Sequence, residues 1–359
     1  MTTTRHTTLT YRLSFNTPAF LGNAEQQGQW RTPPIKALIR QWWRVAYAAD
    51  HPRGMSVADM RRAEGRLFGV AADGGDSNRS LVRLRLSRWD KGRLTSWNGL
   101  DQDRVTHPEV KNREGRLTPV GAHLYMGYGP LIFSQGTALK NAAAIQAVES
   151  ADLSIAFPSD DESIRLRHAL WLMHHYGTLG GRSRNGWGSF SLTPCDGVPA
   201  FAAGLDKALT LPWRDALQTD WPHAIGTDVK GALIWQTEAL ADWKAVMRRL
   251  AEIKIGLRTQ FLFRSGKNAP EPEARHWISY PVTNHNVAAW KGKGGDFRLP
   301  NSLRFKVRAE PDGKLVGVVF HVPCLPPSEF RPDRTAITRV WEQVHRHLDD
   351  VARLKRIPA

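Results

Sequence analysis

The stretch WLMHHYGTLGGRSRNGWGSF, from Trp171 to Phe190, decides the fold that the sequence predicts. It reads as the end of a helix, a loop rich in glycine and arginine, and the beginning of a strand. The glycines let the backbone take positive φ angles, so that several N–H groups can point toward one ligand. Arg182 and Arg184 add forked donors that match phosphate oxygens and stack on bases. The loop therefore predicts an anion site, built around Gly177, Gly180, Gly181, Gly186 and Gly188.

Two other readings of this loop have to be weighed. Glycine clusters often mark simple turns, so a glycine-rich hairpin with solvated arginines is the alternative. Nucleotide hydrolysis is not favoured, because the loop has neither the closing Gly-Lys-Ser/Thr of a Walker motif nor the order of a dinucleotide fingerprint.

Composition favours a polyanionic partner. The 359 residues include 50 Lys and Arg against 34 Asp and Glu, a net charge of +16, and 14 tryptophans. Arginines beside aromatic side chains are what single-stranded nucleic acid needs for phosphate contact and base stacking. We therefore expect RNA or DNA to meet a folded basic surface.

The sequence indicates a soluble cytoplasmic protein without a metal or cofactor. No apolar run approaches the ~20 residues that span a bilayer, and the N-terminus lacks a secretory apolar core. Cys195 and Cys324 are too far apart to suggest a zinc motif or a disulfide framework.

The first half predicts one α+β unit with the order β-α-β-β-α-β, the split arrangement of ferredoxin-like and RNA-recognition folds. Period-two and helical patterns mark its elements. A capping-box spacing from Ser159 to Glu162 opens the second helix, and Gly177 ends it. Residues 88–150 lack strong periodicity and are interpreted as an insertion. The expected strands are 8–15, 80–87, 152–157 and 186–192, and the expected helices are 35–47 and 162–176.

The second half predicts a degenerate copy of this unit. We expect strands at 231–237, 277–282, 302–307 and 315–322, with helices at 240–255 and 336–353. The fold class is therefore α+β, with two tandem ferredoxin-like, RNA-recognition-motif-like units. The first unit spans 1–195 and carries the insertion, 196–229 is a linker, and the second unit spans 230–359.

The first expected helix has two faces. Ile35, Leu38, Ile39, Trp42 and Ala46 form the core stripe. A second stripe interleaves basic and aromatic residues and would suit a phosphate backbone with stacked bases. The alternative is a solvated helix face whose arginine stems cover apolar surface. The second stripe consists of Lys36, Arg40, Trp43, Arg44 and Tyr47.

Five motifs together resemble a known family. They are Thr17–Gly22 (TPAFLG), Arg31–Arg44 (RTPPIKALIRQWWR), Leu67–Gly69 (LFG), Tyr125–Gly129 (YMGYG) and Gly180–Phe190 (GGRSRNGWGSF). This set is similar to the first Cmr subunit of type III-B CRISPR effector complexes, a member of the repeat-associated mysterious protein superfamily.

The resemblance implies a non-catalytic RNA-binding subunit in antiviral defence. Its partners would be the 3′ part of the CRISPR RNA, the target RNA paired with it, and other Cmr subunits. In such complexes a different subunit cuts RNA with an aspartate between its first strand and first helix. Here the stretch 16–31 holds Glu25 and no aspartate. The RNA-binding candidates are Lys36, Arg40, Trp43, Arg44, Tyr125, Tyr128, Gly180, Gly181, Arg182, Arg184, Gly186 and Gly188, with loop packing as the alternative role of the two tyrosines.

Two further functions remain open at this point. A metal-independent CRISPR-repeat endoribonuclease of the same superfamily would need a histidine for general acid-base chemistry, and His174 and His175 precede the loop. The processing enzymes carry their histidine near the first helix, which has none here. An RNA-binding scaffold outside CRISPR is the other possibility, which the charge and the fold permit.

Overall fold

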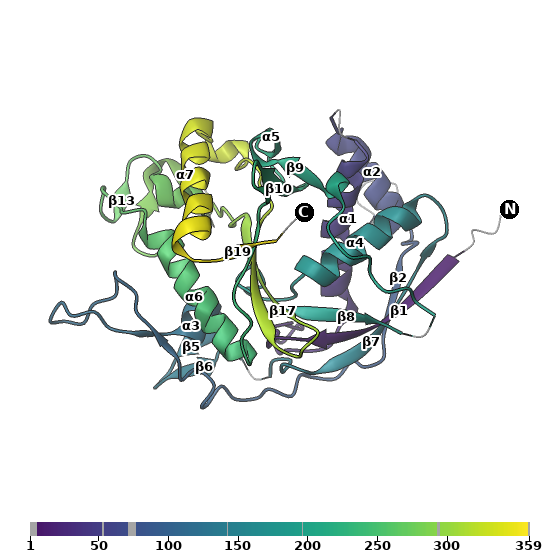
Figure 1. Cartoon of the computed structure of the whole chain (residues 1–359), viewed down its shortest axis with the longest axis horizontal. Helices are drawn as coiled ribbons and strands as arrows, with labels where there is room; N and C mark the ends of the chain where they lie inside the picture. Colours follow the sequence, from purple (N-terminus) through teal and green to yellow (C-terminus); the bar gives the residue numbers. More distant parts are fainter. Residues whose placement is uncertain are drawn as a thin grey trace. The chain divides into compact units, whose positions relative to one another are not determined.

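The computed structural model describes residues 6–51, 54–70, 77–141, 143–195, 197–292 and 295–357. The fold is a mixed α+β fold (Figure 1). The chain divides into two compact units that interleave in sequence. Unit 1 comprises 1–98, 127–209 and 306–313, and unit 2 comprises 99–126, 210–305 and 314–359.

Unit 1 is organised around a four-stranded antiparallel sheet in the order β2-β7-β1-β8. Leu9, Leu13, Leu153 and Ile155 are buried at alternate positions, so one face of the sheet belongs to the core. Helices α1 and α4 cover that face (Figure 1). The elements are β1 (His6–Phe15), α1 (Thr32–Ala49), α2 (Val57–Phe68), β2 (Arg83–Leu86), β7 (Ser150–Pro158), α4 (Glu162–Tyr176), β8 (Phe190–Pro194) and a 3₁₀ turn (Lys207–Leu209).

The strands and helices expected for the first half are present in the expected order, with α2 as an addition. The helix α4 begins at Glu162 and ends at Tyr176, with Gly177 as the residue that stops it, as its pattern predicts. Ser159 does not cap it, however. The residue before the helix is Asp161, whose side chain makes no capping hydrogen bond, and Asp160 accepts instead from the Glu162 N–H at 3.1 Å.

The predicted insertion is shared between the two units. Its first part, β3 (Arg104–Val105), β4 (Val120–Gly121) and most of α3 (Ala122–Gly127), belongs to unit 2. Its second part forms the hairpin β5 (Leu131–Phe133) and β6 (Thr137–Leu139) in unit 1. The turn around Tyr125 is therefore a short helix, from which the chain passes from unit 2 into unit 1.

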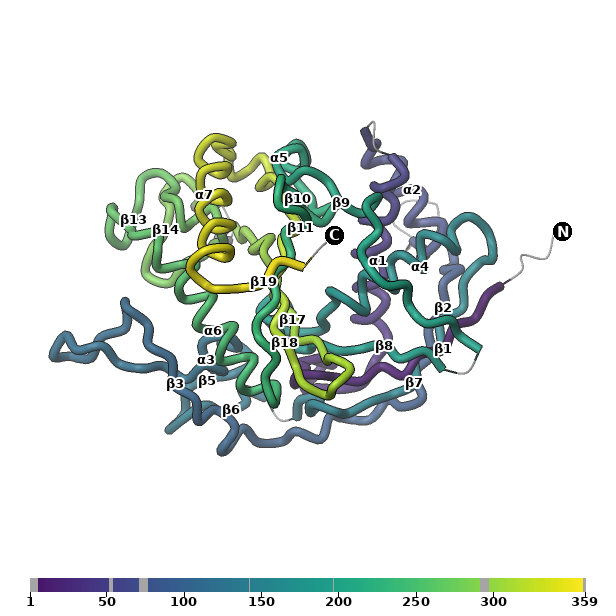
Figure 2. Tube along the Cα trace, in the orientation of Figure 1, coloured from purple at the N-terminus to yellow at the C-terminus, as the bar shows by residue number. Residues whose placement is uncertain are grey.

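Unit 2 contains a second four-stranded sheet, in the order β17-β18-β12-β19 (Figure 2). By chain order this is second, third, first and fourth strand, the same arrangement as in unit 1. Its elements include β12 (Ile234–Gln236), α6 (Trp243–Thr259), β17 (Leu303–Ala309), β18 (Leu315–His321), α7 (Arg334–Arg346) and β19 (Lys355–Arg356). From Lys306 onward, β17 belongs to unit 1.

Smaller elements complete unit 2 and change three expectations. The segment predicted as a linker contributes β9 (Thr210–Pro212), α5 (Trp213–Ala216) and β10 (Ile225–Asp228), which form a three-stranded sheet with β11 (Gly231–Ala232). The strand predicted at 277–282 is absent from these described residues, where a 3₁₀ turn (Ala274–Trp277) is followed by isolated bridges at Tyr280 and Val282. The last predicted helix ends early, at Arg346, and continues as a π turn (His347–Val351). Short paired segments are β13 (Asn268–Ala269) with β14 (Asn286–Val287), and β15 (Lys291–Gly292) with β16 (Gly295–Asp296).

Within the described ranges, no helix has both the length and the apolar character needed to cross a bilayer.

Candidate nucleic-acid interface

The glycine loop lies between α4 and β8, and its glycines are required by close packing. A Cβ on Gly188 would lie 1.8 Å from the Leu179 carbonyl oxygen, and one on Gly180 would lie 2.6 Å from the Phe20 carbonyl oxygen. Gly180, Gly186 and Gly188 also have positive φ angles, which side chains rarely adopt. The loop is therefore folded tightly against the segment that follows β1.

The backbone of the loop binds to the protein rather than to one free concavity. The Gly181 N–H donates to the Phe20 carbonyl at 2.9 Å, and the Gly188 N–H donates to the Pro18 carbonyl at 2.8 Å. The Gly186 N–H is also used within the loop. These three N–H groups are not available to an anion. The expectation that the glycine N–H groups point together toward one ligand is therefore wrong for these three. What the loop offers to a ligand is its side chains.

Arg182 is the most exposed side chain of the loop. Its Nε donates to the Tyr128 carbonyl oxygen at 2.5 Å, and its own φ angle is positive at 55°. Arg184 is half-buried, two residues further along. The structure thus joins the glycine loop to the turn at Tyr128, and the sequence names residues of both as RNA-binding candidates. Whether they contact RNA remains a prediction.

Two exposed aromatic rings lie in and just after the turn that Arg182 contacts. Tyr128 is 65% exposed, and Phe133, at the end of β5, is 68% exposed. A bridge between Tyr128 and Leu131 connects the turn to this hairpin. Phe133 was missed by the sequence reasoning, because its segment has no periodicity. The signal that could have found it is the Gly-Pro and Ser-Gln-Gly turns that flank a short apolar run.

The second stripe of α1 does not form the exposed surface that the sequence predicts. Trp43 is completely buried, with its Nε1 donating to Glu162 at 3.0 Å, and Tyr47 is also buried. Neither ring can stack on a base in this structure, so the interleaved basic and aromatic face is corrected to a face that packs against α2 and α4. The physical reason is that α1 is covered on two sides.

The basic residues of α1 are engaged by neighbouring elements. Arg40 Nε and Arg44 Nη2 bind the Glu64 carboxylate of α2 at 2.7 and 2.9 Å. Lys36 Nζ donates to the Ser80 hydroxyl at 2.7 Å, and burial together with Arg40 lowers its pKa. Because Glu64 itself is buried, these contacts hold α2 on α1 and favour the structural role of the stripe.

Tyr125 and Tyr128 belong to different units. Tyr125 belongs to unit 2, where its ring contacts the His107 ring at 5.5 Å and Lys254 lies 5.4 Å from its centroid. Its hydroxyl is buried without a hydrogen-bond partner among the described residues, and burial raises its pKa. Tyr125 therefore packs within unit 2, which favours the alternative role of loop packing for this residue.

His174 and His175 are partly buried beside the loop. His174 Nδ1 accepts from the Leu192 N–H at 3.0 Å and its ring stacks on Phe201, while the His175 ring packs on Trp171. Burial, and the neighbouring Lys306 and Arg308, lower the pKa of each to about 3. Both rings are therefore neutral near pH 7 and are already occupied by structural contacts.

Lys306 of β17 caps the C-terminus of α4. Its Nζ donates to the carbonyls of Met173, His174 and Gly177, the last at 3.0 Å, and lies 4.9 Å from the Phe190 ring centroid. Burial, with Arg308 nearby, lowers its pKa well below the ordinary value. No local sequence signal could reveal this residue, because it lies 129 residues from Gly177. It fixes the beginning of the glycine loop.

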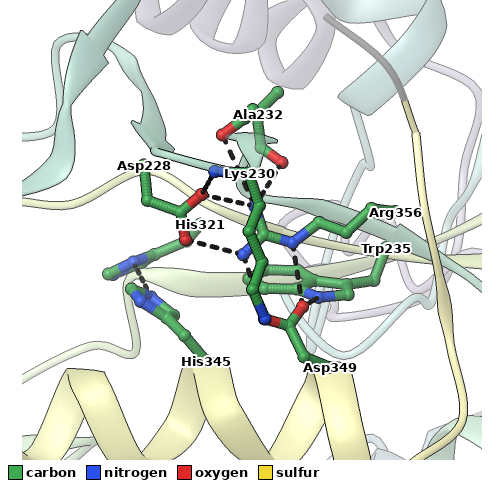
Figure 3. Close-up of polar contacts among 9 residues, drawn as sticks. Asp228, Lys230, Ala232, Trp235, His321, His345, Asp349 and Arg356 are labelled. Atoms are coloured by element: carbon green, nitrogen blue, oxygen red, sulfur yellow. Dashed lines mark hydrogen bonds and ion pairs between the residues drawn. The ribbon is translucent and has the colours of Figure 1, made fainter.

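A cavity of about 800 Å³ in unit 2 is the other candidate site. Figure 3 shows two of its acidic residues engaged by the last strand: Arg356 binds Asp228 at 2.8 Å and Asp349 at 2.9 Å. Lys230 and the Trp235 indole also donate to Asp349. Burial alone would raise the pKa of Asp349, but these hydrogen bonds lower it. The carboxylates thus anchor β19 to the sheet, and we assign this network a structural role.

No group of three or more His, Cys, Asp or Glu is placed to hold a metal ion in the parts of the chain that the structure describes.

Comparisons with known proteins give one family match and several solved structures. The crystal structure of Cmr1 from Pyrococcus furiosus in its apo form aligns at 15% identity and a TM-score of 0.44, over 88% of this chain and 87% of that chain. The cryo-EM structure of type III-B Cmr-beta bound to cognate target RNA aligns at 13% identity and a TM-score of 0.44, over 95% and 100%. A search of curated protein sequences found no match.

The family match covers the region that contains the glycine loop. The model of the RAMP superfamily matches residues 12–191, which run from β1 to the beginning of β8 and include α1, α4 and the whole loop between α4 and β8. Since this is half of the chain, the protein belongs to the RAMP superfamily.

Proposed function

We propose that this chain is a non-catalytic, RNA-binding subunit of a type III-B CRISPR effector complex, built from two tandem ferredoxin-like units. The observation that carries the proposal is the Arg182 guanidinium, exposed on a rigid glycine loop and bonded to the backbone of the exposed Tyr128. A forked cation beside a free aromatic ring suits one phosphate and one stacked base of a single strand.

Three further observations support the proposal. The chain belongs to the RAMP superfamily, and its motifs resemble those of the first Cmr subunit. Its net charge of +16 favours a polyanion. Both four-stranded sheets have the same order of strands, which supports the tandem arrangement. The RNA would be the 3′ part of the CRISPR RNA or the target paired with it, and the partners would be other Cmr subunits.

The repeat endoribonuclease is the weaker candidate. General acid-base catalysis needs a histidine that reaches the substrate and titrates near the working pH. His174 and His175 are mostly buried, with pKa values of about 3, and His174 is hydrogen-bonded to the Leu192 N–H. This supports a structural role for both.

The test measures binding and cleavage of the same labelled single-stranded RNA, which contains a CRISPR repeat, with and without Mg²⁺. We expect intact RNA and an affinity that falls with salt, with a slope of roughly −0.7 per phosphate contact. Arg182→Ala/Arg184→Ala should lower both the affinity and the slope. The matched control is Arg61→Ala/Arg66→Ala, which removes two exposed arginines from α2.

Three results would contradict the proposal. Discrete cleavage products that disappear in His174→Ala or His175→Ala would favour the endoribonuclease. Equal affinity and slope for the loop variant and its control would make the loop structural. A chain that binds RNA but does not assemble with the other Cmr subunits would favour a scaffold outside CRISPR.

A further inference from the structure

The unit 1 sheet has a second face, opposite the one that α1 and α4 cover. Strand register places its residues: Arg83 pairs with Ala156, and Arg85 pairs with Ser154, which in turn pairs with Thr10. Directly paired residues in antiparallel strands point to the same side. The Thr10 and Ser154 hydroxyls lie 3.0 Å apart, which agrees with this register. We call this surface the open face, made of Thr8, Thr10, Arg12, Arg83, Arg85 and Ser154.

The positive charge of the open face comes from its edge strand. Arg12 is neutralised by Asp152, at 2.7 Å. Arg83 and Arg85 are both exposed, and neither takes part in an ion pair within the described part of the chain. Two residues apart on a strand, they lie roughly 6.6 Å from each other on the same side. The edge of the sheet therefore presents two adjacent cations that the protein itself does not neutralise.

Register also places Asp152, the partner of Arg12, and Ala156 on this side of the sheet, and the remaining side chains of the open face are small and hydroxylic. Thr8, Thr10 and Ser154 carry groups that both donate and accept hydrogen bonds. Register places no Phe, Tyr or Trp on this face; its one aromatic ring among the described residues is the His6 imidazole at the end of β1. Proteins that bind single strands stack bases on several aromatic rings, so this face has little of the chemistry for unpaired bases. It differs in this respect from the loop with Tyr128.

A paired RNA fits the same chemistry better. An A-form duplex presents a wide, shallow minor groove lined with 2′-hydroxyl groups, with phosphates along both sides. A flat hydroxyl surface can meet the 2′-hydroxyls while arginines at its edge bind phosphate oxygens. We propose that the open face binds the backbone of a double-stranded RNA, independently of its sequence. The proposal rests on the RNA-binding function given above and adds a second site with a different substrate form.

The experiment compares full-length variants on a labelled RNA duplex, on one of its strands alone, and on a DNA duplex of the same sequence. Arg83→Ala/Arg85→Ala should weaken binding to the RNA duplex by roughly tenfold and reduce its salt slope by about 2, one per phosphate contact. Binding to the single strand should change little. Arg83→Lys/Arg85→Lys, which keeps both charges, should restore most of the slope. Arg61→Ala/Arg66→Ala is the control for net charge, and equal thermal unfolding shows that each variant is folded.

The outcomes separate this proposal from the function on which it rests. If Arg182→Ala/Arg184→Ala weakens binding but the sheet variant matches its control, the proposal for the open face is wrong and the RNA-binding role of the glycine loop is kept. Arg83 and Arg85 then only protect an edge strand from pairing. If the sheet variant loses assembly with other subunits and keeps RNA affinity, the face binds an acidic protein and the proposal is wrong. A wild-type chain that binds none of the probes overturns both.

Discussion

Tyr128 and Phe133 are two aromatic side chains that the fold leaves largely in solvent. Both belong to the segment that adjoins the glycine loop, and Tyr128 shares a hydrogen bond with Arg182 through its carbonyl. Burial of Trp43 and Tyr47, and packing of Tyr125 within unit 2, remove the three other rings that the sequence offered for stacking. If bases stack on unit 1 next to this loop, these two rings are the available partners.

Replacing either ring should weaken binding of single-stranded RNA. Tyr128→Ala and Phe133→Ala are each expected to lose about 1–3 kcal/mol of binding free energy, the usual contribution of one stacked base, with an unchanged salt slope. Fluorescence anisotropy with a labelled single strand measures this. Ile164→Ala, which removes an exposed apolar side chain from α4, should have no effect. An RNA with abasic sites should bind parent and variants equally; a persistent difference would mean that the rings do not stack on bases.

At the scale of elements, the contact between α1 and α2 depends on one carboxylate. Glu64 on α2 accepts from Arg40 and from both Nε and Nη2 of Arg44, and it is almost completely buried. A buried charge that loses its partner is strongly destabilising, whereas an exposed pair contributes little. Since the arginines are partly exposed, we expect an intermediate effect.

Glu64→Gln should lower the free energy of unfolding by about 1–3 kcal/mol and leave RNA affinity close to that of the parent. Urea unfolding and anisotropy measure the two quantities. Asp59→Asn, which changes the same charge at an exposed position on α2, serves as the control. A clear gain in RNA affinity for Glu64→Gln would show that Arg40 and Arg44 can bind RNA once released, contrary to their structural role.

The sequence predicted elements better than it predicted their surfaces. Period-two and helical patterns are local, so β1, α1, β7, α4 and β8 could be located from them. Whether a helix has one or two covered sides depends on distant segments, and for that reason Trp43 was assigned to the wrong surface. The glycine loop was found because close backbone packing permits only glycine. Its N–H partners, Pro18 and Phe20, could not be inferred, since they come from a loop without periodicity.

For the molecule as a whole, several neutral histidines make stability depend on pH. The pKa of His174, His175 and His345 is lowered to about 3, chiefly by burial, against an ordinary value of 6.5. The unfolded chain therefore takes up protons as the pH falls below 6.5, while the folded chain does so only near 3. Unfolding is favoured progressively across that window, by about 1 kcal/mol per pH unit for each histidine.

We expect the urea midpoint to fall steadily from pH 7 to pH 5. His175→Phe should reduce this dependence and raise stability at pH 5, because the buried Nε2 of His175 has no hydrogen-bond partner among the described residues. Ile164→Ala, a substitution of an exposed residue that does not titrate, should keep the parent's pH dependence. A midpoint that does not change between pH 7 and pH 5 would show that the three rings are accessible to protons in the folded state.

The contact between Lys306 and the end of α4 can form only late in synthesis of the chain. The carbonyls at the end of α4 leave the ribosome with Gly177, but their donor follows 129 residues later. At elongation rates of ~5–20 residues per second, the wait is on the order of 10 s. During that time the end of α4 has no ammonium group to bind, so the loop that follows it gains its final anchor only when β17 has been translated. An expressed fragment that ends after β8 would lack Lys306, so the end of α4 would never gain this anchor.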